Sequence, residues 1–137
     1  MEREKLFRGK RTDNGEWVCG DLLQDVESGI CAIVSYVNLG GNIHDLSESC
    51  IFAVIPETVG QCTGSIDKNR TKIFEGDIVQ AFTRYGTKHI YPIKYRNGTF
   101  WFGNWNWIEF LDRFQFREAI GNIHDPELLG GDPNDQM

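Results

Sequence analysis

Two Asn-Gly dipeptides, Asn14-Gly15 and Asn97-Gly98, constrain the fold of this chain more than any other feature of its sequence. Asn-Gly is the preferred dipeptide of the two-residue type I′ turn, in which both central residues have positive φ angles. Each dipeptide lies between runs rich in apolar, aromatic and β-branched residues, which are typical of strands. The sequence therefore predicts two β-hairpins, over residues 5–23 and 88–103.

The turn of the first hairpin predicts its register. A two-residue loop at Asn14-Gly15 places Arg8 opposite Asp21. One side of the hairpin then carries three apolar side chains and two glycines: Phe7, Val18, Leu22, Gly9 and Gly20. The other side carries further apolar residues: Leu6, Trp17 and Leu23. We expect both sides to be partly covered, and the two glycines to let another backbone or side chain approach closely.

The second hairpin has a clearer core face. The same reasoning pairs Ile93 with Phe102, Lys94 with Trp101, and Tyr95 with Phe100. One face then collects apolar and aromatic side chains: Tyr91, Ile93, Tyr95, Phe100 and Phe102. We predict that this face packs on the core and that Trp101 lies on the opposite face beside Lys94.

Further strands are predicted on both sides of the centre of the chain. Apolar runs at 30–37 and 50–55 are of strand length, and Pro56 ends the second. Gly76-Asp77 forms a turn before a strand at 78–82, and residues 118–123 form a closing strand. Residues 107–116 are ambiguous between a short helix and a strand: Ile108 and Leu111 fit helical spacing, whereas Phe110, Phe114 and Phe116 fit neither period cleanly. Residues 43–49 read as a loop and 125–129 as one helical turn.

Together these elements predict a mainly β protein with short helical turns. Residues 1–55 form an N-terminal hairpin region with strands that pack on a core. Residues 56–129 form that core, and residues 130–137, rich in Gly, Pro and Asp, form a disordered tail.

Charge and hydropathy exclude some classes of function. The 137 residues carry a net charge of −6, from 14 Lys and Arg against 20 Asp and Glu, which argues against a surface that binds duplex nucleic acid. The N-terminal cations, interspersed with acids, are interpreted as solvated strand side chains: Arg3, Lys5, Arg8, Lys10 and Arg11. The charged N-terminus does not resemble a signal peptide, and no apolar run approaches the ~20 residues of a membrane span. We expect a cytoplasmic protein.

No group of residues predicts catalysis or metal binding. The cysteines at 19, 31, 50 and 62 form no Cys-x-x-Cys pair, so they are interpreted as reduced, largely buried thiols. Glu75 and Asp77 flank Gly76 and are better explained as turn residues than as a catalytic pair. His44, His89 and His124 are far apart in the sequence, and no phosphate-binding loop is present. We expect no enzyme activity, metal or cofactor; a small hydrolase or nuclease is the weakest alternative.

Aromatic residues cluster between positions 100 and 107: Phe100, Trp101, Phe102, Trp105 and Trp107. The candidate interaction surface consists of three of them and two nearby cations: Trp101, Trp105, Trp107, Lys94 and Arg96. Exposed Trp side chains anchor protein contacts, which the acidic balance of the chain favours; the partner is then a second copy or another protein. They also stack nucleic-acid bases, so a small nucleic-acid-binding module is the alternative hypothesis.

Several blocks of the sequence have a distinctive pattern. They are residues 7–11, 15–18 and 20–22 at the start, 54–64 in the middle, 67–69 and 72–79 after it, and 120–129 at the close. These blocks occur in order over nearly the whole chain, and together they resemble the YopX-like family of bacteriophage and prophage proteins. Arg70 stands where many relatives have glycine, and Cys62 stands where an aromatic residue is expected.

The resemblance implies a β-rich fold with an SH3-type barrel, here over residues 56–129, in a phage or prophage accessory protein. It implies no catalytic residues. The shared motifs are interpreted as turns and strand starts: Pro56, Gly60, Gly64, Gly76 and Gly121. These motifs are compatible with maintenance of the fold alone. The structural turn residues predicted for the whole chain are Asn14, Gly15, Pro56, Gly60, Gly64, Gly76, Asp77, Asn97 and Gly98.

Overall fold

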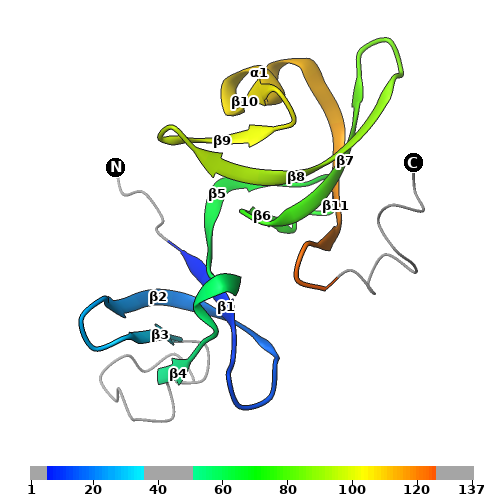
Figure 1. The fold of residues 1–137 in the computed structure, drawn as a ribbon. Helices are drawn as coiled ribbons and strands as arrows, with labels where there is room; N and C mark the ends of the chain where they lie inside the picture. Colours follow the sequence, from blue (N-terminus) through cyan, green and yellow to red (C-terminus); the bar gives the residue numbers. More distant parts are fainter. Residues whose placement is uncertain (1–5, 36–50, 126–137) are drawn as a thin grey trace, which may run out of the picture. The chain divides into compact units, whose positions relative to one another are not determined.

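The computed structural model of the chain describes residues 6–35 and 51–125. The fold is mainly β, with two antiparallel sheets and one α-helix (Figure 1). It divides into two compact units, Met1–Cys62 and Thr63–Met137, whereas the sequence suggested a division between residues 55 and 56. The predicted loop at 43–49, the helical turn after Asp125 and the tail at 130–137 lie outside the described residues, as do His44 and Cys50.

The N-terminal unit contains β1 to β4 and the start of β5, which belong to a six-stranded sheet in the order β4-β3-β2-β1-β5-β6, with β6 spanning Lys72–Phe74. The first five strands are β1 (Phe7–Lys10), β2 (Trp17–Asp25), β3 (Ile30–Val34), β4 (Ile51–Ala53) and β5 (Gly60–Ile66). The short 3₁₀ helix η3 (Pro56–Thr58) connects β4 to β5. Pro56 occupies the first position of η3, so the ladder ends before it, as predicted.

The core of the N-terminal unit lies on the side of the first hairpin that carries Phe7, Val18 and Leu22. Its buried residues are Cys31, Ile33 and Val54, and the side chains packed against them include Phe7, Val18 and Leu22. The two glycines allow the expected close approaches: a Cβ at Gly9 would lie 3.0 Å from the Val54 Cβ. At Gly20 a Cβ would collide with the carbonyl oxygen of Val34. No larger residue fits there without moving the backbone of β3.

The predicted register of this hairpin is wrong by two residues. Arg8 pairs with Cys19 rather than Asp21, and Lys10 pairs with Trp17. The backbone N–H of Arg11 donates to the carbonyl oxygen of Glu16 at 2.8 Å, so four residues form the loop instead of two. Because side chains alternate along a strand, a shift of two residues leaves every side chain on its predicted face.

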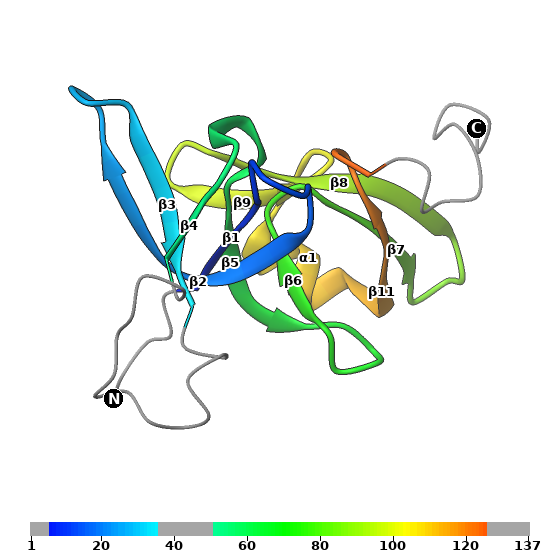
Figure 2. The ribbon, with the colours of Figure 1, turned by 90° about the horizontal axis from the view of Figure 1, so that it is seen from below.

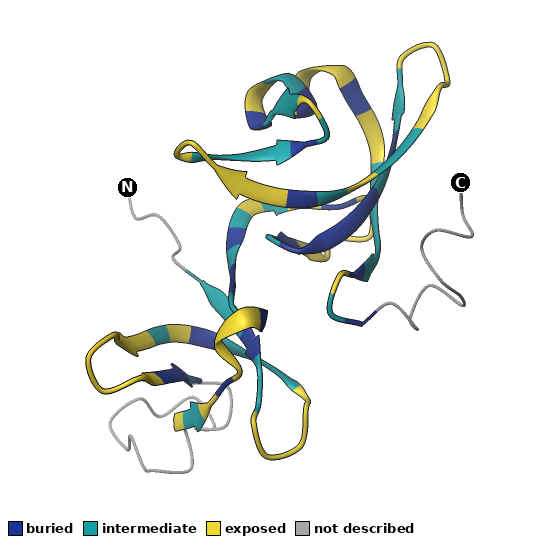
Figure 3. Ribbon diagram, viewed as in Figure 1, coloured by how far each residue is buried: buried dark blue, intermediate teal, exposed yellow. Residues whose placement is uncertain are grey.

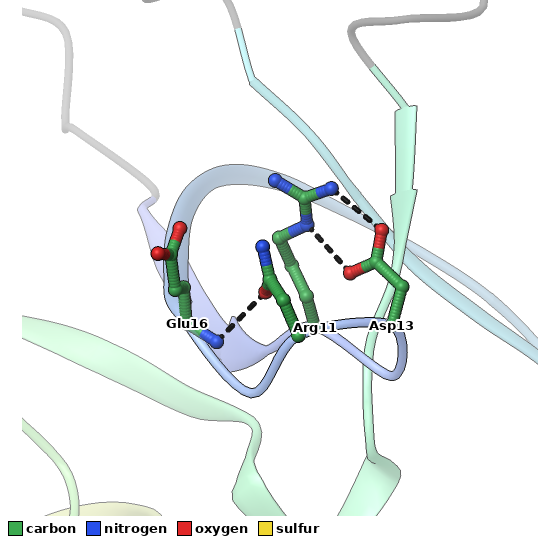
Figure 4. Close-up of polar contacts among 4 residues, drawn as sticks. Arg11, Asp13 and Glu16 are labelled. Carbon is green, nitrogen blue, oxygen red and sulfur yellow. Dashed lines mark hydrogen bonds and ion pairs between the residues drawn. The ribbon is translucent and has the colours of Figure 1, made fainter.

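Polar contacts inside the loop stabilise the wider turn (Figure 4). The Asn14 side chain accepts a hydrogen bond from the backbone N–H of Glu16 at 2.9 Å, a local bond that competes with the type I′ geometry. Arg11 donates through Nε and Nη2 to the two carboxylate oxygens of Asp13, at 2.9 and 2.6 Å. This bidentate hydrogen bond lowers the pKa of Asp13 and raises the pKa of Arg11.

The C-terminal unit contains the remaining strands, seen from a second direction in Figure 2. They are β6 (Lys72–Phe74), β7 (Asp77–Thr83), β8 (Lys88–Arg96), β9 (Thr99–Phe102), β10 (Trp105–Asn106) and β11 (Phe114–Asn122). Five of them form a sheet in the order β10-β9-β8-β7-β11. Among the described strands this sheet has two separate edges, β10 and β11, so the closed SH3-type barrel is not confirmed.

The second hairpin, β8–β9, has the predicted turn and register. Asn97 and Gly98 have φ angles of 53° and 81°, both positive as a type I′ turn requires. The observed partners are those predicted: Ile93 with Phe102, Lys94 with Trp101, and Tyr95 with Phe100. On the core face Ile93 and Phe102 are fully buried, whereas Tyr91 and Tyr95 at its margins are exposed.

The ambiguous segment contains both a helix and a strand. Helix α1 (Trp107–Arg113) begins at a capping box: the Asn106 side chain accepts from the Glu109 N–H, and the Glu109 carboxylate accepts from the Asn106 N–H. Strand β11 follows at once from Phe114. The apolar positions that suggested helical spacing, Ile108 and Leu111, are exposed; Trp107 and Phe110 face the core instead.

The core of the C-terminal unit surrounds β7, which is buried over most of its length (Figure 3). Its fully buried side chains include Ile73, Val79, Ile93, Phe102 and Phe110. Asp77 begins β7 and is 4% exposed. Its Oδ2 accepts from the backbone N–H of Phe74 at 2.8 Å, and its Oδ1 accepts from the Asn122 side chain at 3.2 Å. Asp77 is therefore a turn residue, as predicted, and it accepts a hydrogen bond from nearby backbone.

A second buried aspartate, Asp67, organises the turn between β5 and β6. Asp67 Oδ1 accepts from the backbone N–H groups of Asn69 and Thr71, both at 2.9 Å. Its Oδ2 accepts from the N–H of Ala119 in β11 at 3.0 Å, which ties the turn to that strand. Arg70 completes the turn with a φ of 66°, in the region that favours glycine.

Candidate interaction surface

Three of the five predicted surface residues line one hollow on the hairpin β8–β9. Lys94 and Arg96 are alternate residues of β8, so they point to the same face, and Trp101 faces Lys94 across the ladder. The hollow has a volume of about 220 Å³, and its remaining lining comes from Tyr91, Pro92, Gly103 and Asn104. We call it the β8–β9 pocket. None of the described residues that line it carries a carboxylate.

Arg96 is held in a defined position in this pocket. Its guanidinium carbon lies 4.5 Å from the centre of the Trp101 ring, a cation–π contact. Its Nη2 donates to the carbonyl oxygen of Gly103 at 3.4 Å. The Trp101 Nε1 donates to the carbonyl oxygen of Arg96 at 3.0 Å. Trp101 is therefore half-buried and supports the arginine of the pocket.

Trp105 and Trp107 do not belong to this surface, so the prediction that grouped them with Trp101 is wrong. Trp105 pairs with Phe102, on the face of the sheet opposite Trp101. There its ring contacts Phe114 at 4.9 Å and His89 at 5.3 Å. Trp107 is 8% exposed and belongs to the core. Alternation along β9 and β10 separates residues that are close in sequence.

The sheet of the N-terminal unit exposes a second apolar surface that the sequence did not reveal. In the register of β2, β3 and β4, one face carries Leu23, Ile30, Ala32, Val34, Ile51 and Ala53, with Asp21 and Asp25. We call this the outer face. Leu23, Ile30 and Ile51 are 45%, 55% and 45% exposed, although the opposite face of the same strands packs on the core. The sequence does carry a sign of this second surface: the runs of β3 and β4 are apolar at consecutive positions, so apolar side chains point to both faces of the sheet.

The residues considered for catalysis in the sequence lie in contacts that stabilise the fold. The carboxylate of Asp77 accepts hydrogen bonds from Phe74 and Asn122, as described above. His89 packs edge-on against Phe114, with ring centres 5.3 Å apart. Cys31 is buried, and this burial, followed by the charge of Glu57, raises the pKa of its thiol. Within the described ranges, no group of three or more His, Cys, Asp or Glu side chains is arranged to hold a metal ion.

None of the helices in the described part of the chain combines the length and the apolar character that crossing a membrane requires.

Comparison with protein families gives a match over most of the chain. The sequence model of the family described as YopX protein matches residues 6–130. The chain belongs to the YopX family. The matched region includes both Asn-Gly dipeptides, the β8–β9 pocket and the outer face.

The fold of this YopX-family chain is also similar to a solved structure. It resembles the crystal structure of protein EF1440 from Enterococcus faecalis, with a TM-score of 0.58 and 24% sequence identity. The similarity covers 93% of this chain and 99% of that one. At this identity the likeness shows the fold alone. No curated protein matches the chain.

Proposed function

We propose that this YopX-family chain is a non-enzymatic accessory protein of a phage or prophage that works through protein contacts, with a second copy of itself as the first partner to test. The proposal includes a cytoplasmic location and an SH3-type arrangement of residues 56–129. It is supported by the family membership, by the compact meander β7–β8–β9, and by the surfaces described above.

One observation carries the proposal: the sheet of the N-terminal unit is apolar on both faces. Antiparallel sheets commonly pack one face on the core and present polar residues on the other. Here Leu23, Ile30 and Ile51 lie on the outer face with about half of each side chain exposed. Contiguous exposed apolar surface rimmed by polar residues is typical of protein interaction sites.

The test compares the wild-type chain with a Leu23→Glu, Ile51→Glu double variant. Light scattering over a range of concentrations measures self-association, and capture of the tagged chain from a bacterial lysate, with nuclease added, measures other protein partners. We expect the double variant to lose whichever association the wild-type chain shows, because two charges then lie in the apolar contact.

Val26→Glu is the matched control, since Val26 is 90% exposed at the tip of the β2–β3 hairpin and lies outside the outer face. It should associate as the wild type does. A wild-type chain that is monomeric at every concentration and retains no protein after nuclease treatment contradicts the proposal.

Nucleic-acid binding is the second candidate function, favoured by the convergence of Lys94, Arg96 and Trp101 on one pocket. Its test is a salt titration of labelled single-stranded DNA and RNA. Binding that weakens as salt rises, and that Lys94→Gln reduces, supports it; no binding even at low salt excludes it.

A further inference from the structure

We propose that the β8–β9 pocket binds a carboxylate on an acidic segment of a partner protein. The inference rests on the proposed function, because it assigns the partner to the protein class, and it adds the chemistry by which the C-terminal unit recognises that partner. It concerns a different surface from the outer face and is tested separately.

The charge of the pocket selects an anion. Lys94 and Arg96 are both exposed at its wall, and no carboxylate lines the pocket among the described residues. Elsewhere in the described chain, three cations form ion pairs with acids: Arg11 with Asp13, Lys68 with Glu118, and Arg113 with Glu109. In a chain of net charge −6, two neighbouring cations without an acid in the same pocket complement an anionic partner group.

Arg96 is ordered for bidentate recognition. The Trp101 ring supports one face of the guanidinium, and the Gly103 carbonyl oxygen accepts from Nη2. An arginine held in this way loses less conformational entropy when it binds, and its planar fork of N–H groups matches the two oxygens of a carboxylate. Lys94 adds a second positive charge on the same face of β8.

The same contacts disfavour a nucleic-acid base as the ligand. Base stacking needs an open aromatic face, whereas Arg96 already lies over the Trp101 ring and the Trp101 Nε1 donates to a backbone carbonyl. The pocket volume of about 220 Å³ is also below the ~300–1,000 Å³ typical of pockets that enclose a small-molecule ligand. One acidic side chain fits this volume, with Pro92 and Tyr91 as an apolar wall for its methylene groups.

The experiment titrates the ¹⁵N-labelled full chain with a short peptide in which glutamate alternates with leucine. The matched probe has glutamine in place of glutamate, and an oligothymidylate tests the nucleic-acid class. The readouts are the side-chain N–H signals of Arg96 Nε and Trp101 Nε1. We expect the glutamate peptide to shift both signals, to bind more weakly as salt rises, and to bind roughly tenfold more tightly than the glutamine peptide.

Variants then locate the binding. Arg96→Gln should lower the affinity for the glutamate peptide by roughly tenfold, and Lys94→Gln should lower it by a few-fold. Lys88→Gln is the control, because Lys88 is an exposed lysine on the same strand outside the pocket; it should bind as the wild type does. Equal binding of the two peptides, no binding of either, or tighter binding of the oligothymidylate overturns the inference.

The two proposals fail in different ways. If the glutamate peptide does not bind but the outer-face double variant loses a protein partner, only the carboxylate inference falls. If the glutamate peptide binds at Arg96 while the wild-type chain shows neither self-association nor a nuclease-resistant partner, the carboxylate chemistry of the pocket is supported and the proposed function falls.

Discussion

At the scale of single residues, the turn after β5 shows a backbone conformation that its side chain does not favour. Arg70 has a φ of 66° and is exposed, so no burial of its side chain offsets the unfavourable left-handed conformation. The turn holds because Asp67 accepts three backbone hydrogen bonds around it.

We therefore predict that Arg70→Gly stabilises the protein. Glycine removes a steric cost of about 1–2 kcal/mol, partly offset by its greater entropy in the unfolded chain, which leaves a net gain of about 0.5–1 kcal/mol. Urea denaturation measures it. Arg84→Gly is the control, since Arg84 is an exposed turn arginine without a positive φ; it should be neutral or slightly destabilising. Loss of stability in Arg70→Gly would show that the side chain contributes contacts that offset the strain.

At the scale of elements, local side-chain bonds decide where the chain changes direction. Asn14-Gly15 and Asn97-Gly98 are the same dipeptide, yet only the second forms the two-residue turn. In the first loop the bond from the Glu16 N–H to the Asn14 side chain and the Arg11–Asp13 pair stabilise a longer connection. In the same way, the capping box at Asn106 starts α1 within a segment whose apolar pattern fits either element.

The start of α1 provides a prediction at this scale. Asn106→Ala removes the acceptor for the Glu109 N–H and should lower the free energy of unfolding by about 1 kcal/mol. Asn104→Ala, two residues earlier and exposed, should change it by less than about 0.5 kcal/mol. Thermal or urea unfolding of the two variants checks the difference; equal stability of both would exclude a role for the cap.

At the scale of the whole molecule, each unit has its own core, and the sheet of the N-terminal unit has two apolar faces. Leu22 and Leu23 are neighbours on β2 that point to opposite faces. Leu22 packs against the core, and Leu23 is 45% exposed on the outer face. Leu23, Ile30 and Ile51 are thus exposed on the outer face, whereas the opposite face of the same strands packs on the core.

Because Leu22 and Leu23 point to opposite faces, the same substitution is predicted to have different consequences at the two positions. Leu22→Glu should cost about 2–4 kcal/mol, because it places a charge beside Ile33 and Val54 in the core. Leu23→Glu should change the stability of the dilute protein by less than about 0.5 kcal/mol and act on association instead. Urea denaturation at low protein concentration separates the two. A large loss of stability in Leu23→Glu would mean that this residue supports the fold.

Much of the local structure followed from the sequence alone, because it depends on neighbouring residues. The β8–β9 turn, its register and its core face follow from the positive φ angles that Asn-Gly tolerates and from the period of two along a strand. The mainly β character, the bonds of Asp77 at the start of β7, and the end of β4 before Pro56 have equally local causes. Lys94, Arg96 and Trp101 line the same pocket because one hairpin carries all three.

Only the tertiary structure decided the features that depend on residues far apart in the chain. Trp105 and Trp107 face the core because β10 and α1 turn back onto the sheet, which spacing along the sequence does not reveal. Asp67 is buried where its side chain accepts a hydrogen bond from the backbone N–H of Ala119, which is 52 residues away in the sequence. Whether an apolar strand face is covered also depends on which element packs against it. The outer face and the carboxylate-free lining of the β8–β9 pocket therefore emerged only when the strands were placed side by side.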